Sequence, residues 1–322
     1  MRPLTGKVLG AYIVVCLVWG STYLAIRVGV RHMPPALFGG IRFLVAGTTL
    51  LGLAAALRYR LPSRLRDWWT AAIVGILLLG IGNGLVIWAE QYVESGFVAI
   101  LIVTGALWMA GFDAIIPGSD TRPTWRQFVG LLVGLAGTAI LVGGNVEGFG
   151  AAGLLGPVGV VVAAASWALG SIYSKRHPVE TGPHVHAALQ MVFGGGFLVL
   201  VGLLRREAGA LEFTPEGLAA VAYLIVFGSI VAYTSYVYLL RHAAPAFIGT
   251  HVYVNTVVAV LLGWVLLGEH VTPWTFVAMA VIIGSVMWVR REVVTSRRDH
   301  ALIDPDRAYP RSASTAGRSR DR

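Results

Sequence analysis

Trp19-Gly20-Ser21-Thr22-Tyr23 lies midway along the first apolar run of the chain, and a similar stretch, Ser166-Trp167-Ala168-Leu169-Gly170-Ser171, follows about half a chain later. An apolar run of about 20 residues can cross a lipid bilayer as a helix. In such a helix, small residues allow close packing and hydroxyl groups can hydrogen-bond to neighbouring helices. The repetition suggests two related halves around a shared site.

The composition places the chain in a membrane. Of its 322 residues, 56% are hydrophobic and only 13% are charged, and the mean hydropathy is +0.73. Soluble domains carry about 25% charged residues. The excess of apolar residues must face lipid, where only helices and closed barrels satisfy the backbone. The long apolar runs favour helices, so we expect an all-α polytopic membrane protein.

Ten apolar ranges predict ten transmembrane helices: 8–30, 35–57, 68–90, 95–117, 124–144, 152–174, 183–204, 217–240, 244–268 and 272–290. With the N-terminus in the cytoplasm, 20 of the 25 Lys and Arg residues fall on the cytoplasmic side. Because positive residues gather on that side, we expect a multi-pass protein of the plasma or inner membrane with both termini cytoplasmic. This distribution also accounts for the net charge of +9 without nucleic acid.

The chain divides into two repeats and a tail. Residues 1–147 form the first expected five-helix repeat, residues 148–291 the second, and residues 292–322 a polar, disordered cytoplasmic tail. Five expected helices separate the two tryptophan stretches, and an odd number inserts the second repeat in the opposite orientation. Inverted repeats are typical of secondary transporters, whose sites lie near the bilayer midplane between the repeats.

Several polar or aromatic residues fall at similar depth, which predicts a central midplane cavity. The expected substrate-binding residues are Trp19, Ser21, Thr22, Arg42, Asn83, Thr104, Trp167, Tyr253 and Asn255. For each residue taken alone, a role in helix packing is the favoured explanation, and the argument for a site rests on their convergence.

Arg42 is the one basic residue deep inside an expected helix. A charge in that position is costly, so it should face the interior of the bundle and have a partner. It can anchor an anion or carboxylate of the substrate or act as an outer gate. The structural alternative is an ion pair or a carbonyl cap, with Glu90 at an accessible depth.

Proton coupling has three candidate residues: His251, Glu90 and Glu269. Histidine changes its charge near physiological pH, which suits a proton relay. The alternative is a neutral, hydrogen-bonded packing histidine. The two carboxylates lie near helix ends, where solvated or capping roles are common.

The residues also carry a resemblance to a known family. The first repeat resembles the EamA family of the drug/metabolite transporter superfamily at Val18-Trp19-Gly20-Ser21-Thr22-Tyr23, Pro34-Pro35, Arg42-Phe43 and Gly130 to Gly137. The second is similar at Ser166-Trp167-Ala168, Tyr253-Val254-Asn255 and Leu267-Gly268-Glu269. The runs Gly82 to Gln91 and Phe227 to Ile230 look like the YedA-type subgroup. The chain departs from the family at Ala106 and Thr256, where proline is common, and at Pro117 to Asp120, where a glutamate is usual.

The resemblance implies ten helices around a central cavity, with the fifth and tenth peripheral, and export of small metabolites, amino acids or drug-like solutes. We expect a secondary-active exporter that works by alternating access, with proton coupling left open. The alternatives are an integral-membrane enzyme acting on lipid-like substrates and a membrane sensor. The expected partners are a small-molecule substrate and the lipid bilayer, and a homodimer is left open. We expect no enzyme activity, no cofactor and no metal; Gly148 to Gly153 fits a dinucleotide motif but lacks its strand context.

Overall fold

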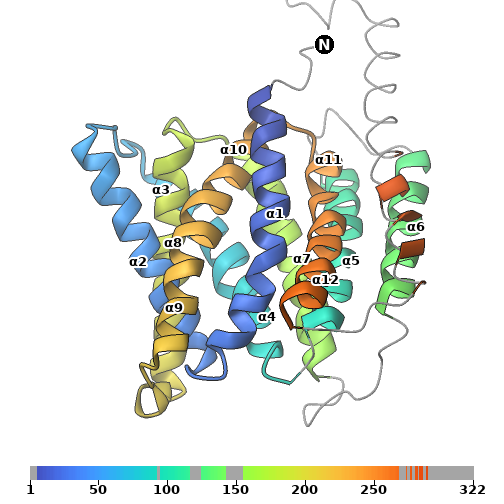
Figure 1. Cartoon of the computed structure of the whole chain (residues 1–322). Helices are drawn as coiled ribbons and strands as arrows, with labels where there is room; N and C mark the ends of the chain where they lie inside the picture. Colours follow the sequence, from blue (N-terminus) through green and yellow to red (C-terminus); the bar gives the residue numbers. More distant parts are fainter. Residues whose placement is uncertain are drawn as a thin grey trace, which may run out of the picture.

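The computed structural model describes residues 6–92, 95–116, 125–142 and 155–267, together with isolated positions between 273 and 288. In this part of the chain every regular element is a helix, and the helices stand side by side in one bundle (Figure 1). Six stretches are long and apolar enough to cross a membrane: Gly6–Gly29, Pro35–Ala56, Leu65–Ala89, Leu155–Arg176, Pro183–Leu204 and Pro215–His242. The prediction of an all-α, multi-pass membrane protein is confirmed.

The helix bounds follow the expected ranges. Continuous helices are α1 (Gly6–Gly29), α2 (Pro35–Ala56), α5 (Ser95–Ile115), α6 (Trp125–Val142), α7 (Leu155–Arg176), α8 (Pro183–Leu204), α11 (Pro245–Gly249) and α12 (His251–Leu267). Two further stretches each consist of three consecutive pieces: α3 (Leu65–Gly75), η1 (Ile76–Asn83) and α4 (Gly84–Ala89), then α9 (Pro215–Tyr223), η3 (Leu224–Tyr233) and α10 (Thr234–His242). Within the described residues, helices match nine of the ten predicted ranges. The range 272–290 lies largely outside them, so the count of ten stays a prediction.

Proline sets the first residue of several helices. The starts of α2, α8, α9 and α11 are Pro35, Pro183, Pro215 and Pro245. Proline suits this position because its fixed φ matches the helix and its missing N–H would have no partner there. The start of α2 is also capped by Glu207 of the short helix η2 (Glu207–Ala210). Its Oε2 accepts hydrogen bonds from the backbone N–H groups of Ala36 and Leu37, each at 3.0 Å.

The pieces η1 and η3 are π-helical, with wider turns than the α-helices that flank them. Such turns are rare and occur often at functional sites. The spacing between the first residues of η1 and η3 equals the spacing between Trp19 and Trp167. The sequence gives no composition signal for either segment, and we did not expect them.

Glycines bring α2 and α8 into close contact. A Cβ atom added at Gly40 would lie 2.9 Å from the backbone nitrogen of Val199, and one added at Gly195 would lie 2.8 Å from that of Leu44. These separations are too short for any side chain, so the two backbones pack directly against each other. Small residues serve the same purpose in other membrane helix pairs.

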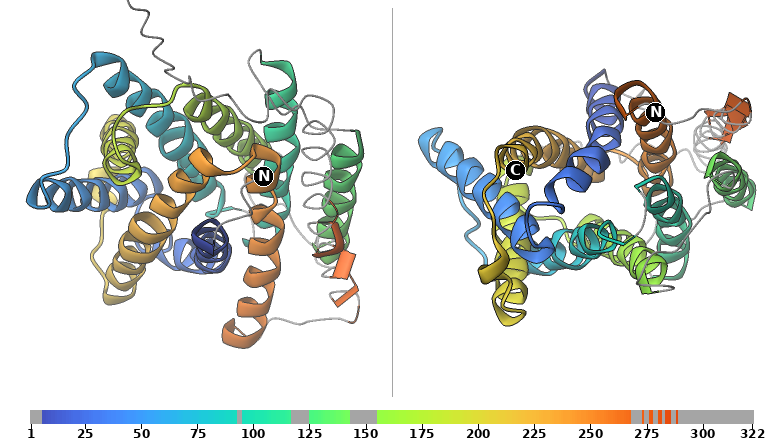
Figure 2. Two further views of the ribbon diagram at one scale, coloured as in Figure 1. Left: turned by 90° about the horizontal axis from the view of Figure 1, so that it is seen from above. Right: turned by 60° about the horizontal axis from the view of Figure 1, so that its bottom comes forward.

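Helix α6 lies at the edge of the bundle, as both views of Figure 2 show. Trp125 is 74% exposed and Leu132 is 41% exposed. The hydroxyl of Tyr253 on α12 donates a hydrogen bond to the carbonyl of Leu131 at 2.9 Å, which joins α6 to its neighbour. The resemblance implied a peripheral fifth helix, and α6 occupies that place.

Candidate functional site

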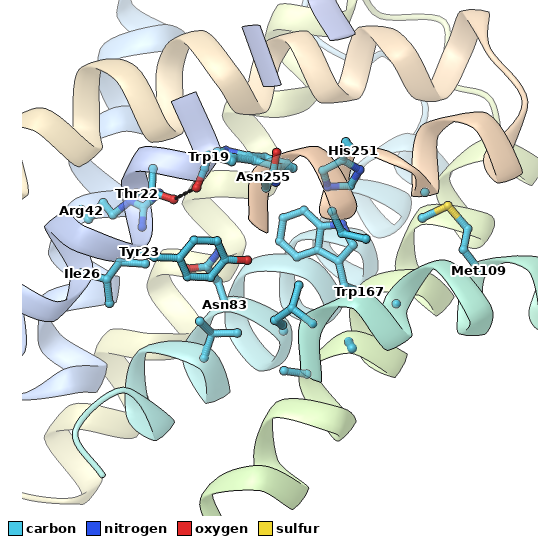
Figure 3. A pocket seen from close by; sticks show the side chains of 18 residues that line it. Trp19, Thr22, Tyr23, Ile26, Arg42, Asn83, Met109, Trp167, His251 and Asn255 are labelled. Carbon is cyan, nitrogen blue, oxygen red and sulfur yellow. Dashed lines mark hydrogen bonds between the residues drawn. The ribbon is translucent and has the colours of Figure 1, made fainter. Parts of the chain in front are cut away.

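A pocket of about 90 Å³ lies among helices from both halves of the chain (Figure 3). By the same measure a single water takes about 10–15 Å³, so the pocket has room for several waters or for one small solute. Its lining comes from α1, α2, η1, α4, α5, α7, α11 and α12. The lining residues are Trp19, Thr22, Tyr23, Ile26, Arg42, Gly82, Asn83, Val86, Ile102, Gly105, Met109, Ala163, Ala164, Trp167, Gly249, His251, Val252 and Asn255.

An aromatic cluster forms one wall of the pocket. The ring centroids of Trp19 and Trp167 are 5.3 Å apart at an interplanar angle of 86°, an edge-to-face contact. Tyr236 lies 5.0 Å from Trp19 and 5.5 Å from Trp167, and His251 lies 5.4 Å from Trp19. Aromatic pairs in this distance range attract each other beyond the burial of their surface. The two tryptophans that the sequence singled out therefore meet.

Both indole N–H groups are engaged by the protein, which fixes the orientation of the rings. The Nε1 of Trp19 donates to the carbonyl of Gly228 in η3 at 3.1 Å. The Nε1 of Trp167 donates to the hydroxyl of Tyr236 at 2.9 Å, and that hydroxyl also hydrogen-bonds Ser171 at 2.8 Å. Because their polar atoms are already bonded, both rings offer the pocket mainly apolar and π surface.

His251 and Asn255 lie on one face of α12. Both line the pocket, and both also form hydrogen bonds to backbone carbonyls. The Nδ1 of His251 lies 2.7 Å from the carbonyl of Ile248. A carbonyl can only accept, so Nδ1 carries a proton and, in the neutral ring, Nε2 is an acceptor. The amide nitrogen of Asn255 donates to the carbonyls of His251 at 2.9 Å and Cys16 at 3.0 Å, which ties α12 to α1.

Arg42 reaches the pocket from α2 and is only 2% exposed. Its Nε donates to the Oγ of Ser229 in η3 at 2.9 Å, and its guanidinium lies 4.7 Å from the centre of the Phe43 ring. Its Nη1 has no hydrogen-bond partner in the described part of the chain. The same holds for the Oδ1 of Asn83. Buried polar atoms without partners are rare, because each costs about 1–3 kcal/mol.

Glu90 lies near enough to Arg42 for an electrostatic attraction, but the two side chains are not joined directly among the described residues. Its side chain is 1% exposed, and neither carboxylate oxygen has a hydrogen-bond partner among the described residues. The described ion pairs do not include one between Glu90 and Arg42. Arg27 instead donates to the backbone carbonyl of Glu90 at 3.4 Å.

The pocket gathers seven of the residues expected from the sequence: Trp19, Thr22, Arg42, Asn83, Trp167, His251 and Asn255. Their role in binding or proton coupling stays a prediction.

Four described candidates, Ser21, Thr104, Tyr253 and Glu90, lie outside the lining. The hydroxyl of Ser21 bonds to that of Tyr223 and that of Thr104 donates to the carbonyl of Leu101, while Tyr253 faces α6. Glu269 lies outside the described residues.

Helical periodicity explains which residues were missed. On α1 the lining residues are Trp19, Thr22, Tyr23 and Ile26, which is the i, i+3, i+4, i+7 pattern of one helix face. Tyr23 and Ile26 could have been found from that pattern, and Ser21 falls off it. On α5 the same rule selects Ile102, Gly105 and Met109 and leaves out Thr104.

Comparison with known proteins identifies the family. The model of the EamA-like transporter family matches residues 6–143 and again residues 154–291. The uncharacterized inner membrane transporter YedA of Escherichia coli K12 is 38% identical over 291 residues, which cover 90% of this chain and 91% of YedA. A probable terminal-alkyne amino-acid exporter of Streptantibioticus cattleyicolor is 26% identical and covers 91% of this chain and 96% of its own length.

A solved structure supports the fold. One crystal structure superposes with a TM-score of 0.70 at 21% identity and covers 90% of this chain and 98% of its own. At that identity the likeness concerns the fold alone. The two family matches begin at residues 6 and 154. The same number of residues separates Trp19 from Trp167 and Arg42 from Gln190. The chain is a multi-pass membrane transporter that belongs to the EamA-like transporter family.

Proposed function

We propose that the protein is a secondary-active exporter of small metabolites or drug-like solutes, and that the pocket alternates between the two sides of the inner membrane. The observation that carries this proposal is the contact between Trp19 and Trp167 in the pocket wall. The two residues hold the same position relative to the two family matches. A site built from corresponding residues of two repeats is the arrangement found in many secondary transporters.

Hydrogen bonds between the halves support a rocking mechanism. Trp19 on α1 bonds to the carbonyl of Gly228 in η3, and Ser166 on α7 bonds to the carbonyl of Leu77 in η1 at 2.8 Å. In each case the first helix of one half holds the π-helical piece of the other half. Motion of one half against the other would strain these bonds in alternation.

The proposal also includes ten helices that form two inverted repeats. It places both termini in the cytoplasm, and the distribution of Lys and Arg residues supports that placement.

The proposed direction is export, supported by the Streptantibioticus cattleyicolor relative, which is named a probable terminal-alkyne amino-acid exporter. Amino acids are accordingly among the candidate solutes, together with amines, nucleosides and apolar toxicants that suit an aromatic wall.

The decisive experiment compares efflux with and without the aromatic contact. Cells that express the wild-type chain should release at least one metabolite that vector control cells retain, and Trp19→Ala should abolish this release. Trp69→Ala is the matched control, because Trp69 is 63% exposed and lies outside the pocket lining. Equal release by wild type and Trp19→Ala, at equal amounts in the membrane, would contradict the proposed site. Absence of any released metabolite would contradict export.

We further propose that His251 couples transport to protons. It lines the pocket, and its Nδ1 bond leaves Nε2 as an acceptor. In proteoliposomes, an imposed pH gradient should drive uptake or release by the wild type but not by His251→Ala. His242→Ala, at an exposed histidine, should behave as wild type. An unchanged response of His251→Ala to the gradient would exclude the histidine as the coupling group.

A further inference from the structure

The pocket has one charged end and one end lined by aromatic rings and a methionine. In Figure 3, Arg42 and Thr22 lie at one side, whereas His251 and Met109 lie at the other, with Trp167 close to His251. The hydroxyl of Thr22 donates a hydrogen bond to the carbonyl of Trp19 at 2.8 Å, so it offers little hydrogen bonding to a solute in the pocket. A solute that fits such a pocket has a polar head and an apolar body.

The charge at the Arg42 end of the pocket is positive. Among the described lining residues, Arg42 alone carries a permanent charge. Its guanidinium is held in place by Ser229 and the Phe43 ring, and the backbone of Gly228 lies close to its Nη2. These contacts leave the hydrogen-bonding capacity of Nη1 unused within the described residues. A fixed, buried guanidinium with an unused donor atom is well suited to hold a carboxylate, in addition to the electrostatic attraction that it shares with Glu90.

Asn83 adds a second, different requirement. It lies at the end of η1, lines the same pocket, and its Oδ1 accepts no hydrogen bond from the described residues. A buried amide oxygen of this kind needs a donor, which the solute can supply as a hydroxyl or amine. The two unfilled atoms, one donor and one acceptor, therefore call for two different groups on one molecule.

We infer that the pocket selects small carboxylates that carry a hydrogen-bond donor near the carboxylate and an aromatic or apolar body. Arg42 Nη1 binds the carboxylate, Asn83 Oδ1 accepts from the donor, and the body lies toward Trp167 and Met109. The inference takes its site from the function proposed above, but it is a statement about binding and is testable without transport.

The test uses four probes with the purified full-length chain in nanodiscs, with dissociation constants measured by calorimetry. Phenyllactate has both groups, phenyllactamide replaces the carboxylate by a neutral amide, and phenylpropionate lacks the hydroxyl. Sulfate represents a simple anion. Wild type should bind phenyllactate about 10- to 100-fold more tightly than phenyllactamide, the effect of one hydrogen bond to a charged group, and about fivefold more tightly than phenylpropionate.

Variants assign each preference to one residue. Arg42→Gln should abolish the preference for acid over amide and keep the preference for the hydroxyl, whereas Arg42→Lys should keep part of the former. Asn83→Leu should abolish the preference for the hydroxyl and keep the preference for acid over amide. Arg31→Gln, at an exposed arginine, is the matched control and should keep both preferences. Each preference is a ratio within one variant, so a reduced folded fraction does not affect it.

Three results would overturn the inference: an acid preference that survives in Arg42→Gln, displacement of phenyllactate by sulfate at equal concentration, or no binding of any probe. If the wild type nevertheless exports a metabolite that Trp19→Ala retains, the proposed function stands and only the solute class is wrong.

Discussion

Arg42 on α2 and Gln190 on α8 hold corresponding places in the two halves, yet they do different things. Arg42 lines the pocket and leaves Nη1 without a partner among the described residues. Gln190 is fully buried outside the pocket lining, and its Oε1 accepts a hydrogen bond from the hydroxyl of Tyr233 at 2.6 Å, while its Nε2 has no partner among the described residues. The helices that carry them pack directly against each other through glycines. The two helices thus share one packing contact, whereas at this pair of positions only the first half contributes a side chain to the pocket.

The largest effect should come from breaking the packing contact that the two helices share. In Gly195→Ala the new Cβ would lie 2.8 Å from the backbone nitrogen of Leu44, which cannot move aside without shifting α2. Overpacking of this kind costs about 1–3 kcal/mol or more. The thermal midpoint, followed by size-exclusion chromatography after heating, should fall clearly.

The neighbouring residue provides the control. A Cβ at Gly196 has no atom within 4 Å, so Gly196→Ala should keep the wild-type midpoint or raise it slightly. Equal midpoints for the two alanine variants would show that the close contact between α2 and α8 is not needed for stability.

The next effect in order, at most as large as that of Gly195→Ala, should follow from changing Gln190 or its partner Tyr233. Gln190→Met leaves the Tyr233 hydroxyl without its acceptor, and Tyr233→Phe leaves the Gln190 Oε1 without its donor. Each change should destabilise the fold by about 1–3 kcal/mol, because a buried polar group loses its partner. The double variant removes both groups and should cost less than the sum of the two single changes. Strict additivity of the three midpoint shifts would mean that the hydrogen bond adds no stability.

The smallest expected effect is a difference in export rate between the phenylalanine variants of Trp19 and Trp167. Trp19→Phe leaves the Gly228 carbonyl without the indole donor, whereas after Trp167→Phe the Tyr236 hydroxyl still has Ser171. Export should therefore fall about tenfold at most in Trp19→Phe, the effect of one hydrogen bond, and less in Trp167→Phe. Initial efflux rates per amount of protein provide the measurement, and the opposite order would contradict this account.

The fold was largely predictable because lipid leaves the chain few choices. Apolar length, loop charges and the prolines at helix starts placed nine helical ranges within the described residues. The π-helical pieces were not predictable, since Ile76 to Asn83 reads as an ordinary apolar run.

The candidate site was only partly predictable, because position along an apolar run gives depth but not direction. Trp19 and Ser21 have similar depth, yet only Trp19 faces the pocket. Tyr253 was expected as an aromatic residue beside Asn255 in the family-like motif, but its hydroxyl bonds to α6. The orientation of each helix is set by packing, for example by Gly20, where a Cβ would lie 2.6 Å from Val258 on α12.

The segments η1 and η3 have a consequence for how such a chain can change during evolution. A π turn contains one residue more than the α turn it replaces. Loss of one residue inside Ile76–Asn83 could therefore be absorbed locally as a return to α geometry, with the residues after it keeping their faces. In an ordinary α-helix the same loss would turn everything after it by about 100°. The two segments are therefore places where the chain can lose a residue while Val86 and the rest of the pocket lining stay in register.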